Sequence, residues 1–136
     1  TKIAFNPSEY LITRVKLNKI LRLIDVLILN KEEAELLTGK KNLLKGICEL
    51  GPEIVVITNG NKKVYCYNGK RVYSVNPPRV KVLDSTGAGD AFAAGFIAGL
   101  IKEKPIEFCL KLGIRESVSE IKYPGAKNKL LKMKLK

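Results

Sequence analysis

Residues 81–92 read KVLDSTGAGDAF, an apolar run that leads into a loop with two glycines and two aspartates. The residues that follow are rich in Ala, Phe and Gly and predict a helix. A glycine-rich turn between a strand and a helix directs free backbone N–H groups and the positive end of the helix dipole at one point, which suits an anion. Asp84 and Asp90 are two of only three aspartates in the chain, so their position beside this turn carries information.

An aspartate beside an anion site cannot serve to bind phosphate, because like charges repel. It is better placed to accept a proton from a hydroxyl group that attacks the phosphorus. An anion site next to such a base suits the transfer of a phosphoryl group to a small molecule. The alternative interpretation is structural: a glycine-capped start of a helix, with an aspartate that has no chemical role.

Residues 84–92, DSTGAGDAF, closely resemble the second signature of the PfkB, or ribokinase-like, family of sugar kinases over nine consecutive positions. The resemblance implies that Asp90 is the catalytic base. It also implies that the amides of Gly87, Ala88 and Gly89 form an anion hole for the transferred phosphoryl group. The expected donor is ATP with Mg²⁺, and the expected acceptor is a sugar hydroxyl.

Composition excludes several other kinds of site. The chain has no histidine, which rules out histidine metal sites and Ser-His or Cys-His catalytic pairs. Cys48, Cys66 and Cys109 are scattered without CxxC spacing, which argues against a disulfide framework or a zinc site and favours a cytoplasmic protein. No apolar run reaches the ~18 residues that span a bilayer, and the first residues show no secretory leader pattern.

The formal net charge is +12 at pH 7, which raises the question of a nucleic acid partner. Five lysines lie in the last ten residues, 127–136, where basic and apolar residues are interspersed. This tail is interpreted as a frayed or docked terminus, with an amphipathic membrane or partner segment as the alternative. The other lysines are spread along predicted helix faces. We therefore expect a solvated surface that attracts ATP, and neither a nucleic acid nor a membrane partner.

Strands and helices alternate in the first part of the chain, which predicts a parallel sheet covered on both faces. Val64–Tyr67 and residues 71–75 flank Asn68-Gly69, which predicts a hairpin with a type I′ turn. Residues 80–83 are expected to run as a strand into the glycine loop. The other predicted strands are residues 2–5, 26–29 and 54–57, and the predicted helical segments are 8–24, 30–37 (stopped by Gly39), 43–50, 88–101 and 105–120.

Asn30 and Glu33 enter a predicted helix from the carboxyl end of a strand, where ligands bind in open α/β sheets. They are three residues apart and so share one face of the first helical turn. A carboxylate there can hold Mg²⁺ through water, and the pair resembles the family's N-x-x-E motif, which implies a role in placing Mg²⁺ and phosphate. The pair also has the pattern of a capping box, and both roles can hold together.

Thr58-Asn59-Gly60 follows the predicted strand 54–57. Family members often have Thr/Lys-x-Gly here, with another glycine three residues later, around ATP. The resemblance implies that Thr58 and Gly60 contact the nucleotide. This chain has Lys63 at the later glycine position, and the alternative interpretation is a polar turn at a strand end.

Two further expectations rest on the resemblance alone. Asp84 and Thr86 match positions that bind a monovalent cation such as K⁺ in some members, through the carboxylate of Asp84 and the carbonyl of Thr86. The alternative is that Asp84 caps the loop. Residues 113–126 would border the adenine, but residues 114–118 read IRESV where members often have small residues, although Gly125-Ala126 is retained.

The order of elements resembles the C-terminal half of a ribokinase-like fold: a three-layer αβα architecture with a mostly parallel sheet, here with one β-hairpin. The N-terminal half, which would carry the first family signature, most sugar contacts and a small β lid, is expected to be absent. The only methionine is Met133, so Thr1 is not expected to be a translation start. We expect a sugar kinase that is inactive as this fragment and whose partner is the missing half or a second copy.

Two alternative functions are compatible with the same sequence. The first is a kinase for a nucleoside or a vitamin such as pyridoxal, or an ADP-dependent archaeal sugar kinase, because these relatives share the GAGD loop. The second is a non-catalytic nucleotide-binding or interaction module, with an unpaired sheet edge that seeks a partner.

Overall fold

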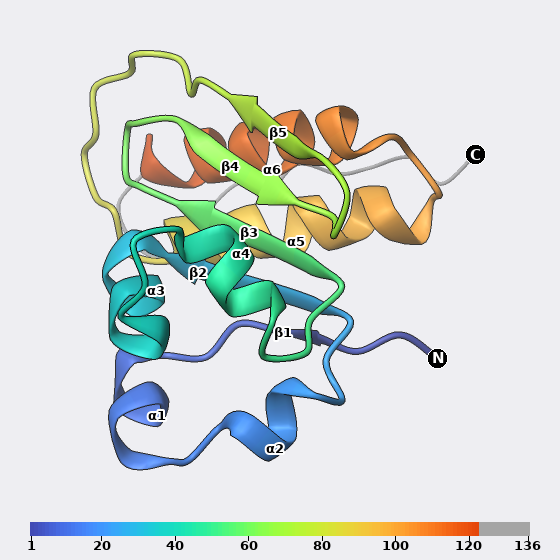
Figure 1. Ribbon diagram of the computed structural model, residues 1–136. Coiled ribbons are helices and arrows are strands. Elements are labelled where there is room, and N and C mark those ends of the chain that lie inside the picture. The colour runs from blue at the N-terminus through green and yellow to red at the C-terminus, as the bar shows by residue number, and fades with distance from the viewer. Residues whose placement is uncertain (123–136) are drawn as a thin grey trace. The chain divides into compact units, whose positions relative to one another are not determined.

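The computed structural model describes residues 1–122 (Figure 1), in two compact units, residues 1–76 and the residues from 77 onward. The expectations for the basic tail and for Gly125-Ala126 concern residues outside that range. No described helix is long and apolar enough to cross a membrane. The elements of the first unit are β1 (Ala4–Phe5), α1 (Glu9–Arg14), α2 (Asn18–Leu21), β2 (Val26–Asn30), α3 (Lys31–Thr38), α4 (Leu43–Cys48), β3 (Ile54–Thr58), β4 (Val64–Tyr67) and β5 (Val72–Val75), and those of the second are α5 (Ala88–Ile101) and α6 (Ile106–Ile121).

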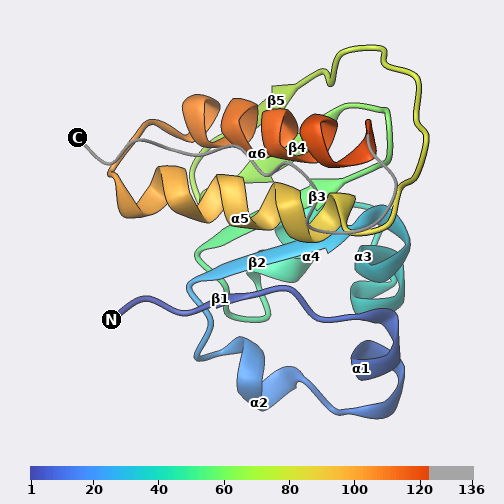
Figure 2. The ribbon, with the colours of Figure 1, turned by 180° about the vertical axis from the view of Figure 1, so that it is seen from behind.

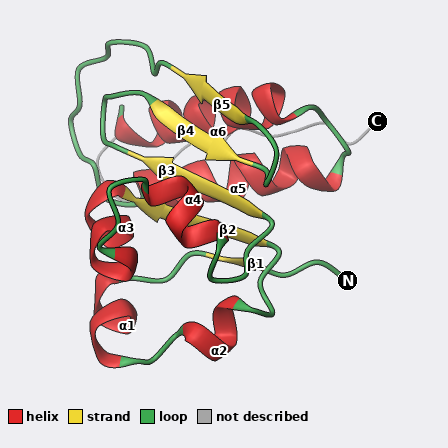
Figure 3. Ribbon diagram, viewed as in Figure 1, coloured by secondary structure: helices red, strands yellow, loops and turns green. Residues whose placement is uncertain are grey.

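The first unit is built on a five-stranded sheet in the order β1-β2-β3-β4-β5 (Figure 3). β1, β2 and β3 pair in parallel, whereas β4 is antiparallel to both β3 and β5. Four of the five strands therefore point the same way, as predicted for a mostly parallel sheet that ends in a hairpin. β4 reverses direction because only residues 59–63 separate it from β3, too few for the crossover that a parallel connection needs.

Apolar residues on one face of β2 and β3 form the core of the first unit. Their side chains alternate along each strand, so Leu27 and Leu29 share a face, as do Val55 and Ile57. The remaining members of this core come from α2, α3, α4 and the segments beside them: Leu17, Leu21, Ile24, Ala34 and Ile47. Val26, Ile28 and Val56 on the other face are also buried, which explains why β2 and β3 are continuous apolar runs in the sequence.

The turn between α4 and β3 lies against the end of α2. Gly51 has φ 143°, in the region that favours glycine. A Cβ at this position would lie 2.6 Å from the Cα of Arg22 and would also meet the Leu21 carbonyl. Glycine is therefore required at position 51 both by the backbone angle and by the close approach of α2.

The helices of the first unit agree with prediction in part. α3 begins after Asn30 and ends at Gly39, whose φ is 59°, as predicted, and α4 is two residues shorter than the predicted 43–50. The prediction of one helical segment over residues 8–24 was wrong. These residues form two helices, α1 and α2, separated by a break at Val15 (φ −119°, ψ 133°). α1 has no buried residue, and the break allows Leu17 and Leu21 to enter the core.

Strand β1 is shorter and more exposed than the buried strand predicted for residues 2–5. Only Ala4 and Phe5 pair with β2, and Ala4 is exposed. β1 lies at one edge of the described sheet, so β2 is its only strand neighbour there. Asp25 fixes its start, because Asp25 Oδ2 accepts the Ile3 N–H at 2.6 Å and the Asp25 N–H donates to the Ile3 carbonyl at 2.9 Å.

β4 and β5 form the predicted hairpin, but the turn is not the expected type I′. The loop spans residues 68–71 and is closed by the pair Tyr67 and Val72. Within it only Gly69 has a positive φ, 80°, whereas a type I′ turn needs positive φ at both central residues. The Asn68 Oδ1 atom accepts the N–H groups of Lys70 at 3.2 Å and Arg71 at 2.8 Å, so an Asn side chain shapes this turn.

The second unit begins with an irregular segment and not with the strand predicted for residues 80–83 (Figure 3). Val82 and Leu83 are 50% and 59% exposed. The Leu83 N–H donates to the carbonyl of Ile121 at 3.0 Å, which ties the segment to the end of α6. Pro77 and Pro78 precede it and have no N–H to donate to a strand ladder.

α5 and α6 lie side by side in the second unit (Figure 2). α5 has the predicted bounds, and α6 begins one residue later than predicted, with Pro105 as its N-cap. Glycines bring the two backbones together. A Cβ on Gly95 would lie 2.9 Å from the Cα of Gly113, and a Cβ on Gly99 would lie 3.1 Å from the Cα of Cys109.

We predict that Gly95→Ala lowers the free energy of unfolding by about 1–2 kcal/mol, because overpacking outweighs the gain in helix propensity. The added methyl would meet backbone atoms of Leu112 and Gly113, each at 2.9 Å. Urea denaturation followed by circular dichroism measures the change. Gly89→Ala, in the same helix, is the matched control, since a Cβ there meets nothing within 4 Å. Equal stability of the two variants would contradict the close approach of α5 and α6.

Candidate active site

The loop of residues 84–87 leads directly into α5. Gly87 is the N-cap and has φ 81°, in the left-handed region that glycine adopts without strain. Its carbonyl accepts the N–H of Ala91 at 2.8 Å, the first turn of the helix. The turn at Gly87 therefore sets the direction in which α5 starts.

Two local hydrogen bonds hold this loop. Asp84 Oδ1 accepts the N–H of Thr86 at 2.8 Å, and the Ser85 carbonyl accepts the N–H of Ala88 at 3.2 Å. The first bond confirms the structural interpretation of Asp84 as a cap of the loop. Ser85 was not singled out in the sequence, although a serine before a glycine turn is a common turn former.

The first turn of α5 presents backbone donors. The first N–H groups of an α-helix have no acceptor within the helix, and here they include those of Gly89 and Asp90. The N–H of Ala88 is bonded to Ser85, so it is less available than the predicted anion hole assumed. Gly89 is exposed, and a Cβ on it would meet nothing within 4 Å. The space where a side chain at position 89 would begin is therefore open.

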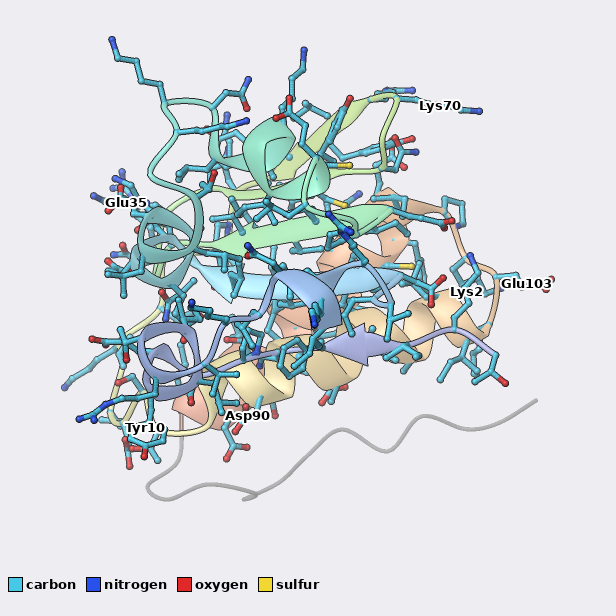
Figure 4. The ribbon with its side chains drawn as sticks, turned by 60° about the horizontal axis from the view of Figure 1, so that its bottom comes forward. Lys2, Tyr10, Glu35, Lys70, Asp90 and Glu103 are labelled. Carbon is cyan, nitrogen blue, oxygen red and sulfur yellow. The ribbon has the colours of Figure 1, made fainter. Side chains whose placement is uncertain are left out.

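Asp90 projects from the same helical turn, where Figure 4 labels it. Its side chain is exposed, and it follows Gly89 directly. A carboxylate near the N-terminus of a helix is stabilised by the helix dipole. The chain thus places a proton acceptor and an open backbone amide next to each other on one rigid element.

Asn30 and Glu33 form a reciprocal pair at the start of α3. Asn30 Oδ1 accepts the N–H of Glu33 at 2.8 Å, and Glu33 Oε2 accepts the N–H of Asn30 at 2.8 Å, which is the predicted capping box. The other carboxylate oxygen, Glu33 Oε1, is not used by this pair. Capping therefore leaves one carboxylate oxygen that can accept a hydrogen bond from metal-bound water.

Thr58 lies beside Asn30, because the two residues are register partners at the carboxyl ends of β3 and β2. The Thr58 Oγ1 donates to the Leu29 carbonyl at 3.4 Å. Gly60 follows in a turn with φ 53°, and a Cβ there would meet nothing within 4 Å. The structure thus brings Asn30, Glu33 and Thr58 to one edge of the sheet, and the space around Gly60 is open.

The predicted site residues form two groups, each internally ordered. One group belongs to the first unit and contains Asn30, Glu33, Thr58 and Gly60; the other belongs to the second unit and comprises residues 84–90.

Ile121, whose carbonyl anchors Leu83, has no sequence signal that could have identified it, because the contact depends on how α6 ends. Among residues 1–122 no three Cys, Asp or Glu side chains cluster as metal ligands would.

Cys48 and Cys109 do not offer a nucleophile. Cys48, Cys66 and Cys109 are free thiols in the described structure. Burial raises the pKa of the Cys109 thiol, and burial together with the negative charge of Glu49 raises the pKa of the Cys48 thiol. Both thiols stay protonated near neutral pH, and the thiolate is the reactive form.

Residues 2–133 match the family model described as pfkB family carbohydrate kinase. The match covers nearly the whole chain and contains both groups of candidate residues. The chain therefore belongs to the pfkB family of carbohydrate kinases.

Three similar proteins illustrate the relationship. A cytidine kinase of Thermococcus kodakarensis is 34% identical over 131 residues, which cover 90% of this chain and 47% of the relative. A crystal structure of a ribokinase from Thermotoga maritima has a TM-score of 0.85 and 24% identity, with 96% of this chain and 46% of that chain covered. A putative ribokinase II from E. coli in complex with ATP and Mg²⁺ has a TM-score of 0.82 and 25% identity, with coverage of 91% and 43%.

These structures confirm the predicted fold class, an α/β ribokinase-like fold that is only partly represented here. The chain spans less than half of the length of the first three curated relatives, 47%, 36% and 46%. Family and fold are thus established.

We predict that Gly89→Ala leaves the fold intact but weakens the binding of MgATP by ~10-fold or more, equivalent to 1.4 kcal/mol. The methyl group would occupy the space through which a phosphate approaches the amide. Amide chemical shifts during a MgATP titration report both fold and affinity. Ala94→Ser, at an exposed position of the same helix, should bind as the parent chain does. If Gly89→Ala kept the parent affinity, the space at Gly89 would not be a phosphate site.

Proposed function

We propose that this chain is the nucleotide-binding and catalytic-base portion of a PfkB-type carbohydrate kinase, which transfers the γ-phosphoryl group of MgATP to a hydroxyl of a sugar or sugar-like molecule. The carrying observation is the start of α5, where the exposed carboxylate of Asp90 follows the open amide of Gly89. A base for the attacking hydroxyl and donors for the phosphoryl oxygens are the two groups that this reaction requires. Membership of the family supports the same reaction class.

In this proposal Asp90 accepts the proton of the sugar hydroxyl as that oxygen attacks the phosphorus. The amides of Gly87, Ala88 and Gly89 stabilise the charge that develops on the transferred group. Gly89 is the principal donor, because the N–H of Ala88 is shared with the Ser85 carbonyl. Thr58 and Gly60 contact the nucleotide from the turn after β3.

Asn30 and Glu33 are the residues that fit Mg²⁺. The ion prefers oxygen ligands and keeps several of its waters, and Glu33 Oε1 is an oxygen outside the capping pair. When bound, Mg²⁺ would neutralise charge on the phosphates. Asp84 and Thr86 are proposed for a monovalent cation such as K⁺, through the Thr86 carbonyl and the carboxylate of Asp84, whose Oδ1 also holds the loop.

The acceptor has a specific alternative. The similar Thermococcus protein is named a cytidine kinase, so a nucleoside hydroxyl is the second candidate beside a sugar hydroxyl. Both acceptors present a hydroxyl to the same base, and the donor nucleotide would lie on the same amides. A panel of sugars and nucleosides in a coupled ADP-release assay separates the two candidates.

We place the protein in the cytoplasm, an assignment that its three free thiols support. Its expected partner is the rest of a ribokinase-like fold, because the chain spans less than half of the similar cytidine kinase. A second copy of the chain is the alternative partner.

We predict that Asp90→Asn, in the natural polypeptide that carries these residues, lowers kcat by ~10²–10⁴-fold, the usual contribution of a general base. Loss of the base removes an interaction made only in the transition state, so the affinity for MgATP should change little. Steady-state kinetics with a saturating acceptor measures both quantities. Glu9→Gln, an exposed change on α1, is the control for loss of one negative charge. Near-normal turnover of Asp90→Asn would refute the assignment of the base.

The 136-residue chain alone is predicted to show no sugar-dependent ATP turnover. Positioning of both substrates supplies much of the rate in phosphoryl transfer, and this chain spans less than half of its kinase relatives. The same coupled assay tests this on the purified chain, with a complete ribokinase as positive control. Sustained sugar-dependent turnover would mean that the acceptor site lies within these residues.

A further inference from the structure

The first unit contains a cavity of about 570 Å³ that none of the proposed catalytic residues lines. Its floor is formed by Ile57 of β3 and Tyr65 of β4, which are register partners across the antiparallel pair. Leu43 and Leu44, at the start of α4, form an apolar wall. The volume falls within the ~300–1,000 Å³ typical of small-molecule sites.

The outer part of this sheet face is partly open to solvent. α4 has six residues, and its Ile47 packs in the core with Val55 and Ile57. Tyr65 on β4 is 42% exposed, and Val72 on β5 is 49% exposed. An aromatic side chain on a rigid sheet is left facing solvent beside an apolar wall.

The rim of the cavity is basic. Lys31, Lys41, Asn42 and Asn59 contribute to it, and no carboxylate belongs to the lining. Lys31 pairs with Glu35 at 3.5 Å, an exposed i,i+4 pair of small energy. Within the described residues no ion pair involves Lys41, whereas its neighbour Lys40 pairs with Glu49.

The Ile57 and Thr58 side chains lie on opposite faces of β3. The Ile57 side chain faces the core between the sheet and the helices of the first unit. Side chains alternate along a strand, so Thr58, the next residue, faces the other way. The cavity lining includes Asn59, between Thr58 and Gly60, and Lys31, next to Asn30, so the cavity borders the proposed nucleotide contacts without including them.

We propose that this cavity is a second ligand site, which binds a small molecule with a flat aromatic body and a phosphate group. Tyr65 would stack on the ring, because ring faces pair favourably in offset stacks. The leucine wall and Ile57 would exclude water from the rest of the body. Lys41 and Lys31 would hold the phosphate as point charges, and the amides of Asn42 and Asn59 offer donors at the rim.

The charge pattern favours a phosphate over an uncharged or cationic ligand. Two ammonium groups with no lining carboxylate attract a dianion and repel a cation. Two lysines without an aromatic floor would be an ordinary solvated surface. The cavity owes its selectivity to the combination of a stacking surface, an apolar wall and Lys41, which has no ion pair within residues 1–122.

The probe for a direct test is 1-naphthyl phosphate, titrated into the 136-residue chain with amide chemical shifts as the readout. We expect shifts at residues 31, 41–44, 59 and 65 with the loop 84–90 unchanged. 1-Naphthol, which keeps only the aromatic ring, and inorganic phosphate, which keeps only the anion, should each bind more weakly than the probe. Shifts confined to residues 84–90 would assign the probe to the proposed catalytic site and overturn a second site.

Variants decide whether the named residues form the site. Lys41→Gln should weaken probe binding by ~5- to 10-fold, and Tyr65→Ala by at least ~5-fold. Lys45→Gln, an exposed lysine of α4 outside the lining, should stay within about twofold because solvent screens its charge. Tyr10→Ala is the matched tyrosine control on α1. Dispersed amide spectra verify that each variant is folded. Equal losses for Lys41→Gln and Lys45→Gln, or no loss for Tyr65→Ala, would overturn the proposal.

Discussion

The parallel pairing of β2 with β3 is the constraint on which the first unit depends. It runs through five register pairs, from Val26 with Ile54 to Asn30 with Thr58. A slip of one residue would turn the core side chains of one strand to the opposite face. The same register makes the two strands end together, so the cap of α3 and the turn after β3 start at one edge. The β2–β3 ladder thus positions the candidate nucleotide contacts of the first unit and Ile57 of the cavity floor.

Structural and chemical roles coincide at several candidate residues, and they do not exclude one another. A carboxylate has two oxygens and about four lone-pair sites, and capping of α3 takes only Oε2 of Glu33. The bond between Asp84 and Thr86 likewise fixes a loop and leaves the Thr86 carbonyl outside it. A side chain that is already ordered by the fold loses little further entropy when it binds a ligand. A hydrogen bond that caps a helix or holds a loop at one of these residues is therefore compatible with a role in binding a ligand.

Features set by short sequence windows could be predicted well. The bounds of α5, the left-handed end of α3 and the capping box depend on neighbours within four residues, so the sequence contains their causes. Residues 80–83 show the limit: a β-branched apolar run becomes a strand only if a partner strand is available, and in the described structure Leu83 bonds to the end of α6. The break at Val15 and the turn at Asn68 also depend on tertiary contacts or side-chain bonds that composition does not reveal.

In the candidate site, too, the sequence predicts the features that depend on neighbouring residues. The run from Asp84 to Asp90 is contiguous, and its family signature identified the residues that form the start of α5. The cavity beside Tyr65 could not be anticipated, because its lining comes from α3, α4, β3, β4 and the loops between them, which only the fold brings together. Engagement of the Ala88 N–H by Ser85 was also beyond sequence reasoning, since it depends on the path of one turn.

The contact between Gly51 and α2 has a consequence for the dynamics of the first unit. α2 has only four residues, too few for a helix to persist in water by itself. It is held by Leu21 in the core and by the turn at Gly51, which lies against Arg22. We therefore expect the amide of Leu21, which bonds to the Leu17 carbonyl, to exchange with deuterated solvent at the rate at which the turn between α4 and β3 opens. The smallest helix among residues 1–122 and a turn thirty residues away are thus expected to open as one cooperative unit.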